Sequence, residues 1–122
     1  MYRRLIFALL IVAASPALAD GDELTPVPAR AVAGHAYLGD FAPSRIRFIN
    51  VRDRSVRLVW VSFDGTERNY AVIAPGQELV QPTFVAHRWL VKDHDQGTPL
   101  GAFISTRSAA RDNGASPIAL IR

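Results

Sequence analysis

From about Ser44 to the end of the chain, apolar and polar residues alternate along short runs that are separated by turn residues. In the first run, Ile46, Phe48 and Asn50 share one parity, and two arginines and an isoleucine hold the other. Strict alternation places successive side chains on opposite faces of a strand, whereas an amphipathic helix repeats every three or four residues. Because these runs alternate and none has a helical period, the sequence predicts β-strands with one buried face.

Turn residues punctuate these runs at regular intervals. Asp64-Gly65 suits a tight hairpin, since glycine supplies a positive φ, and Pro75-Gly76 places proline and glycine at the two central positions of a turn. Turn signals recur about every 8–12 residues, which is typical of an all-β sandwich or small barrel. We predict an all-β fold, an antiparallel β-sandwich of about seven strands with no α domain. Strands are expected at 46–50, 56–63, 69–73, 77–80, 84–92, 100–105 and 117–121, and further turns at 53–55, 93–99 and 111–114.

The N-terminus has the composition of a cleavable secretory signal peptide. Arg3 and Arg4 form a positive region, an apolar run follows, and Ala17 and Ala19 stand two apart before Asp20. The apolar run of about ten residues is short for a membrane span, which needs about 20. We therefore predict cleavage after Ala19 and a periplasmic or secreted protein that has no membrane contact once the signal is removed. An uncleaved N-terminal anchor is the alternative.

Three segments are expected along the chain. Residues 1–19 form the signal peptide, and residues 44–122 form the sandwich. Between them, residues 20–43 are rich in Asp, Gly, Pro and Ala and show no sustained periodicity. Such a segment is either disordered or docked irregularly on the domain. We predict a flexible N-terminal segment at 20–43.

Charge and cysteine content exclude several classes of function. The formal net charge is +3, and signal cleavage would remove two arginines and no acidic residue, so nucleic-acid binding is not expected of the nearly neutral remainder. The chain has no cysteine, which removes thiolate catalysis and zinc–thiolate sites. Asp93-His94-Asp95 carries metal-ligating groups, but three consecutive loop residues rarely form a closed site. We predict no metal and no cofactor.

Aromatic residues concentrate between Trp60 and Trp89, the two tryptophans of the chain. Tyr70, Thr83 and His87 lie in the same stretch, so a few polar groups stand among large rings. Ligand pockets have this composition, with apolar and aromatic walls and a small number of polar groups that fix orientation. His87 and Trp89 are two residues apart and would share one face of a strand. The stretch, expected to span three adjacent strands, predicts a pocket for a small molecule or a peptide side chain.

This stretch resembles the β domain family of the von Hippel–Lindau tumour suppressor. The two patterns run together without a gap from Phe48 to Asp93, and the resemblance covers roughly residues 44–121. The segments that carry it are Ile46–Asn50, the W-x-x-F-D-G motif at Trp60–Gly65, Tyr70, Pro75-Gly76 and His87–Asp93. The combination of these pieces in register is more specific than any one of them. The resemblance implies a β-sandwich and a non-enzymatic binding module.

The resemblance also implies a ligand, because the family binds a peptide that carries 4-hydroxyproline. By position, Trp60, Tyr70 and Trp89 would form the aromatic walls. Thr83 stands where the family has a serine and keeps the hydroxyl group, and His87 matches the family's histidine. These five residues are the predicted ligand-binding site, and the expected partner is a peptide or protein that presents a hydroxyproline-like side chain.

Some features depart from the family. Pro82 replaces a histidine and Phe84 replaces a tyrosine, so two flanking peptide contacts are not carried over. The α domain that recruits elongin C and a ubiquitin ligase has no counterpart before Arg122. Together with the signal peptide, this predicts no ubiquitin-ligase adaptor among the partners.

Other interpretations of the same residues stay open. Trp60 and Trp89 also suit the core of a sandwich, which often contains a central tryptophan. In that case the chain would be a structural or protein-interaction module of the cell envelope without a small-ligand pocket. A hydrolase would need a triad such as Ser62, His87 and Asp64, and no nucleophile-elbow motif supports it.

Overall fold

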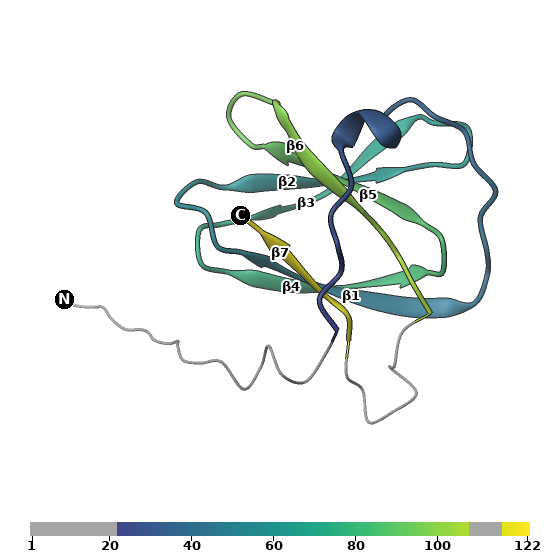
Figure 1. The fold of residues 1–122 in the computed structure, drawn as a ribbon. Helices are drawn as coiled ribbons and strands as arrows, with labels where there is room; N and C mark the ends of the chain where they lie inside the picture. The colour runs from purple at the N-terminus through teal and green to yellow at the C-terminus, as the bar shows by residue number, and fades with distance from the viewer. Residues whose placement is uncertain (1–21, 108–115) are drawn as a thin grey trace.

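A computed structural model describes residues 22–107 and 116–122 and confirms the predicted all-β sandwich (Figure 1). One sheet has the strand order β4-β1-β7 and the other β3-β2-β5-β6. Among these strands the pairings are antiparallel except that of β1 with β7, which is parallel. The predicted signal peptide and the turn expected at 111–114 lie outside the described residues. The strands are β1 (Pro43–Asn50), β2 (Val56–Val61), β3 (Glu67–Ile73), β4 (Glu78–Phe84), β5 (Arg88–Asp93), β6 (Pro99–Ile104) and β7 (Ile118–Ile121).

The main core lies between the two sheets. The alternation in β1 has the predicted effect, because Ile46, Phe48 and Asn50 are all fully buried. Phe48 and Ile46 pack with Leu58 of β2 and Trp89 of β5 in one apolar cluster. Burial of each such large apolar side chain contributes about 1.5–3 kcal/mol. Asn50 is tolerated there because its side chain makes three hydrogen bonds to the backbone.

The N-terminal strap, residues 22–37, lies against the sandwich. Glu23 pairs with Ile118 at β7 and Val27 with Ala102 of β6, and Figure 1 shows the strap crossing from one sheet to the other. The strap includes the single-turn 3₁₀ helix η2 (Ala29–Ala31), after which Val32 is buried. Its apolar side chains cover the outer face of the four-stranded sheet, in a second cluster with Val59, Val61, Leu90 and Ala102. The described part of the 20–43 segment is therefore docked irregularly, and the flexibility expected of the segment stays a prediction.

Two predicted turns connect the strands as expected. Gly65 has φ 90° in the hairpin between β2 and β3, and its N–H donates to the Ser62 carbonyl at 2.8 Å. Gly76 has φ 76° in the connection from β3 to β4, where the Gln77 N–H donates to the Ala74 carbonyl at 3.0 Å. Both glycines adopt the left-handed conformation that other residues disfavour. The second turn passes the chain from one sheet to the other.

The prediction of one long strand at 84–92 is wrong. β4 ends at Phe84 and β5 begins at Arg88, and a tight turn between them carries the chain from the three-stranded to the four-stranded sheet. The His87 N–H donates to the Phe84 carbonyl at 3.2 Å, and Ala86 has φ 71°. A turn with a positive φ at its third residue usually has glycine there, which is why the alanine gave no turn signal. His87 therefore precedes β5.

This strained turn generates a prediction about stability. An alanine in the left-handed conformation costs about 1–2 kcal/mol, and glycine relieves that cost while losing part of the gain to backbone entropy. We expect Ala86→Gly to raise the free energy of unfolding by about 0.5–1 kcal/mol in urea titrations. The matched control is Ala42→Gly, at a neighbouring half-buried alanine whose φ is not positive. This control should lower the free energy of unfolding by a similar amount. A loss of stability in Ala86→Gly would contradict the strain.

Candidate functional site

The five residues predicted to bind a ligand line one cavity. Its volume is about 180 Å³. It lies between the edge strands of the two sheets, β3 and β4, and beside one end of β2 and of β5. The prediction that the site spans three adjacent strands was incomplete. Strands β2, β3 and β5 belong to one sheet, whereas Thr83 comes from β4 of the other sheet. We call this hollow the aromatic cavity. Its lining residues are Trp60, Tyr70, Pro82, Thr83, Phe84, His87 and Trp89.

Trp89 joins the core to the aromatic cavity. Its side chain is 2% exposed and contacts Phe48 edge-to-face in the core, with ring centroids 6.2 Å apart. Its indole N–H donates to the Thr83 hydroxyl oxygen at 3.0 Å, across the gap between the sheets. A hydroxyl group accepts and donates at once, so Thr83 keeps its own hydrogen for another acceptor. Trp89 is thus both a core residue and a cavity wall.

His87 presents an unpaired nitrogen in this site. Its ring stacks on Trp60 at 5.5 Å between centroids and meets Phe63 edge-on at 5.1 Å. Nε2 is buried and has no hydrogen-bond partner among the described residues. Burial lowers the pKa of His87, and the nearby backbone and charge of Asp40 oppose the shift. The imidazole is therefore neutral at pH 7.

The ring nitrogens of His87 consequently have different roles. Nε2 is the nitrogen without a partner, and the Asp40 backbone, whose carbonyl can only accept, lies near the ring. A neutral imidazole carries one proton, and the hydrogen bond that one nitrogen makes decides which nitrogen holds it. With the proton on Nδ1, on the side of Asp40, Nε2 would be a buried acceptor. An unpaired buried acceptor of this kind costs about 1–3 kcal/mol unless something binds it.

Tyr70 reaches the cavity through a β-bulge. In the pairing of β2 with β3, Leu58 is opposite Ala71 and Val59 is opposite Asn69, so Tyr70 is the extra residue. Bulges redirect a side chain and are common beside functional sites. The Tyr70 ring meets Trp89 edge-to-face at 4.9 Å between centroids, and yet it is 52% exposed. It is the outer wall of the cavity.

Three further residues of the site were not predicted as ligand contacts. Pro82 and Phe84 line the cavity, and the sequence marked them only as departures from the family. Asp40 lies close enough to His87 to affect its pKa, and it comes from a segment without periodicity, where no local signal could have identified it. The contact depends on chain segments that lie more than forty residues apart in sequence, and it is visible only in the folded protein.

The residues of the conceivable Ser–His–Asp triad are arranged differently. The Ser62 hydroxyl donates to Asp64 at 2.6 Å and also lies 2.6 Å from the Thr66 hydroxyl. Asp64 also accepts from the Thr66 hydroxyl at 2.7 Å and from the Thr66 N–H at 3.0 Å. None of the hydrogen bonds described for Ser62 involves His87. These bonds close the hairpin that holds Trp60 and Phe63 beside the cavity.

The Asp93–Asp95 loop also has a local role. Asp93 accepts from the N–H groups of Asp95 and Gln96, each at 2.9 Å, and its carboxylate lies 3.3 Å from Arg54. The Gln96 N–H is the main cause that lowers the pKa of Asp93. In the two described stretches, no three His, Cys, Asp or Glu side chains are arranged to hold a metal ion. No helix in these stretches is long and apolar enough to cross a membrane.

Comparison with protein families agrees with this architecture. Residues 37–105, more than half of the chain, match the model of the VHL beta domain, which confirms the resemblance found in the sequence. The match includes β1 to β6 and all residues that line the aromatic cavity. No curated protein matches the chain. The VHL beta domain is a protein-binding module.

The hairpin beside the site predicts how the domain responds to acid. Hydrogen bonds from Ser62 and Thr66 lower the pKa of Asp64 to about 2 from its usual 3.8. A depressed carboxyl pKa stabilises the fold above the unfolded pKa, and this stabilisation is lost as pH falls from about 4 to about 2. We expect Asp64→Asn to have a lower melting temperature at pH 6 and a smaller further decrease down to pH 2. A variant that follows the wild-type acid profile in parallel would contradict this role.

Proposed function

Given that this chain belongs to the VHL beta domain family, whose members bind proteins or peptides, we propose that its aromatic cavity receives a hydroxyproline-like side chain. The side chain would be part of a peptide or protein ligand. The observation that carries the proposal is the pair of free hydrogen-bonding groups, Thr83 and His87, inside an aromatic enclosure. The domain itself would act as a non-enzymatic binding module.

The size of the cavity suits one small ring. A cavity of about 150 Å³ lined by apolar side chains is enough to bind benzene. The aromatic cavity, at about 180 Å³, has room for a five-membered ring with one substituent and not for a large ligand. Aromatic faces bury such a flat apolar body well. The rest of the peptide would lie outside, along the exposed edge strands β3 and β4.

The two polar groups complement a hydroxyl group. The Thr83 oxygen already accepts from Trp89, so its own hydrogen is the group left to donate. The unpartnered Nε2 of the neutral His87 ring would be an acceptor, with the ring proton on Nδ1. A ligand hydroxyl satisfies both at once, because it accepts from Thr83 and donates to His87. A carbonyl or ether oxygen could accept from Thr83 and could not donate to His87, and an unsubstituted ring could do neither.

This complementarity predicts selectivity. A ligand that leaves a buried polar group unpaired loses about 1–3 kcal/mol for each group. Sites built to hydrogen-bond a ligand hydroxyl reject the analogue that lacks it much more strongly than apolar pockets distinguish a methylene. The hydroxylated ring should therefore bind at least about tenfold more tightly than plain proline.

We also propose that the protein is exported. The proposal rests on the composition of residues 1–19, with two arginines, an apolar run and alanines at the expected cleavage positions. In a periplasmic or secreted setting, the ligand would be a peptide or protein of the cell envelope or the exterior. N-terminal sequencing of the exported protein tests this, since it should begin at Asp20.

A second function is favoured by the burial of Trp89. Trp89 is 2% exposed and therefore contributes to the core. In a protein-interaction module without a small-ligand pocket, Trp89 would have this core role alone. Replacing Trp89 by alanine would cost about 3–5 kcal/mol and would not separate the two functions. A variant at an exposed cavity wall separates them better.

Titration of two matched peptides tests the proposal directly. An alanine-based peptide with one central 4-hydroxyproline and its proline twin are titrated into the purified protein by calorimetry. We expect the hydroxylated peptide to bind at least about tenfold more tightly, for the reason given above. Equal affinities, or no binding of either peptide at millimolar concentration, would overturn it.

Tyr70 provides the matched variant for the same titration. Tyr70→Ala removes the outer wall and should weaken binding of the hydroxylated peptide by about tenfold or more, while stability changes little because the side chain is half exposed. Val72→Ala is the control, since Val72 lies on the same strand with the same 52% exposure and does not line the cavity. Identical affinities of the two variants would favour the function without a pocket.

A further inference from the structure

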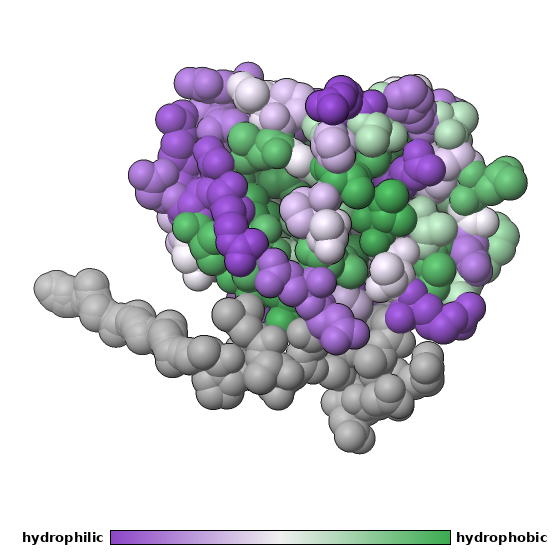
Figure 2. Space-filling model, in the orientation of Figure 1, coloured by the Kyte–Doolittle hydropathy of each residue, from purple (hydrophilic) through white to green (hydrophobic). Residues whose placement is uncertain are grey.

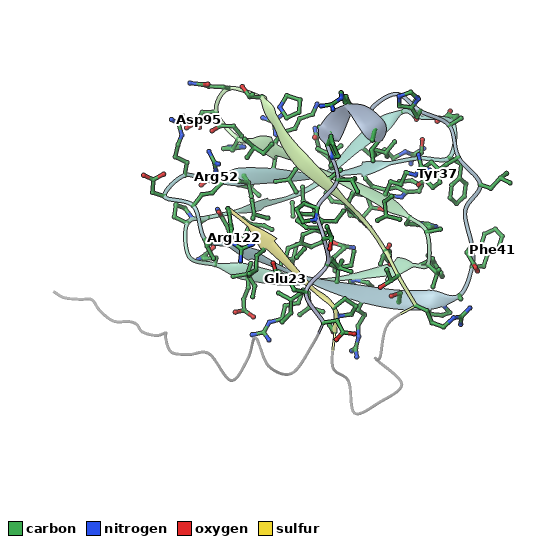
Figure 3. All side chains as sticks on the ribbon, viewed as in Figure 1. Glu23, Tyr37, Phe41, Arg52, Asp95 and Arg122 are labelled. Carbon is green, nitrogen blue, oxygen red and sulfur yellow. The ribbon has the colours of Figure 1, made fainter. Side chains whose placement is uncertain are left out.

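Two large apolar side chains protrude into solvent from the loop that precedes β1. Leu38 is 93% exposed and Phe41 is 79% exposed, the two highest values among the large apolar residues of the described chain. Figure 2 shows hydrophobic residues at one edge of the molecule, and at the same edge Figure 3 shows Phe41 pointing away from the body of the domain. We call residues 37–42 the rim loop. Single exposed apolar residues are common, whereas two on one short loop indicate a contact surface.

The rim loop is held in place at both ends. At its start, the Tyr37 N–H donates to the Phe63 carbonyl at 2.9 Å, and the Arg88 guanidinium lies 4.4 Å from the centre of the Tyr37 ring. At its end, the Ala42 carbonyl accepts from the Val85 N–H at 2.9 Å, and within the loop the Asp40 carboxylate accepts from the Ala42 N–H at 2.8 Å. The exposure of Leu38 and Phe41 is thus imposed by an anchored backbone.

Gly39 brings the middle of the loop onto the domain. Any side chain at this position would collide with the ring of Phe63, so the backbone lies directly against that ring. Phe63 in turn contacts His87 edge-on. The rim loop is therefore packed onto the aromatic group behind the cavity.

The rim loop is continuous with the aromatic cavity. Its Asp40 lies close enough to His87 to affect the pKa of the ring, and the Val85 N–H donates to the Ala42 carbonyl at 2.9 Å. This pairing continues the β1–β4 ladder, in which Pro43 is opposite the cavity residue Phe84. Phe41 lies two residues beyond Pro43, which is about 7 Å along an extended chain. A peptide anchored in the cavity would pass the rim loop within two to four residues.

We propose that the rim loop is a second contact site for the same peptide, where Leu38 and Phe41 bind a large apolar side chain near the residue held in the cavity. This inference rests on the proposed function of the cavity. A peptide is favoured over an anionic lipid surface because the same short loop carries the exposed Asp40 carboxylate, which such a surface would repel. The recognised ligand is therefore a peptide in which a hydroxylated ring is followed or preceded by a residue such as leucine.

The test compares alanine-based peptides that all carry a central 4-hydroxyproline. One has no other large side chain, and the others have a leucine two, three or four residues away on either side. We expect at least one leucine peptide to bind wild-type protein roughly tenfold more tightly than the leucine-free peptide. The double variant Leu38→Ser/Phe41→Ser should lose this gain and bind the leucine-free peptide as wild type does.

Val51→Ser is the matched control. Val51 is 54% exposed and follows β1 at its other end, away from the cavity, so its replacement should leave both affinities unchanged. Thermal unfolding of each variant checks that the fold persists, because exposed side chains contribute little to stability. The two proposals fail separately: no binding of the leucine-free peptide contradicts the cavity, whereas binding of it without any gain from leucine contradicts the rim loop alone.

Two other occupants of the rim loop are measured in parallel. Wild-type protein is sedimented with vesicles of phosphatidylcholine and phosphatidylglycerol, and its molecular mass is followed over a range of protein concentrations. The double variant could abolish vesicle binding or self-association and leave the affinities of the leucine peptides unchanged. That result would overturn the proposal of a peptide at the rim loop in favour of a lipid surface or a second copy. We expect neither.

Discussion

The hydrogen bond from the Trp89 indole to the Thr83 hydroxyl connects the two sheets at the end of the sandwich where the cavity lies. Trp89 belongs to β5 of one sheet and Thr83 to β4 of the other, and both are buried. The same indole packs on Phe48 in the core and supports Tyr70 at the surface. The cavity is therefore built from groups that also hold the fold together. A site of this kind is preorganised, because its walls are fixed by packing before any ligand arrives.

The neighbouring connection shows what such an arrangement costs. The chain must pass from β4 to β5 between the sheets in three residues, and Ala86 adopts a positive φ in doing so. That turn places His87 at the inner end of the cavity, stacked on Trp60. Strained backbone conformations persist where the surrounding structure determines them, and they cluster at functional sites. Here the strain lies one residue before the group that is proposed to meet the ligand.

Much of this architecture could be predicted from the sequence. The alternation of Ile46, Phe48 and Asn50 predicted which face of β1 is buried, and Asp64-Gly65 and Pro75-Gly76 predicted two turns, because these signals are local. The break after Phe84 was missed since alanine is not a turn-forming residue. All five residues proposed for the site line one cavity.

The remaining features depend on contacts between distant segments. The bulge that exposes Tyr70 is set by the register of two strands, and no residue in β3 announces it. The strap covers Val59 and Leu90 on a face of the sheet that would otherwise meet water, and its own sequence has no period. Asp40 affects the pKa of His87, although it lies in a loop that the sequence left undefined. These contacts give the cavity its hydrogen-bonding character.

The protonation of His87 is the most direct test of this account. Nitrogen-15 NMR of the imidazole distinguishes a protonated from an unprotonated ring nitrogen, and it can be followed during titration with a hydroxyproline peptide and its proline twin. The account predicts that Nδ1 carries the proton in the free protein, and that the Nε2 resonance moves in the direction of hydrogen bonding with the hydroxylated peptide alone. A proton on Nε2, or the same response to both peptides, would contradict it.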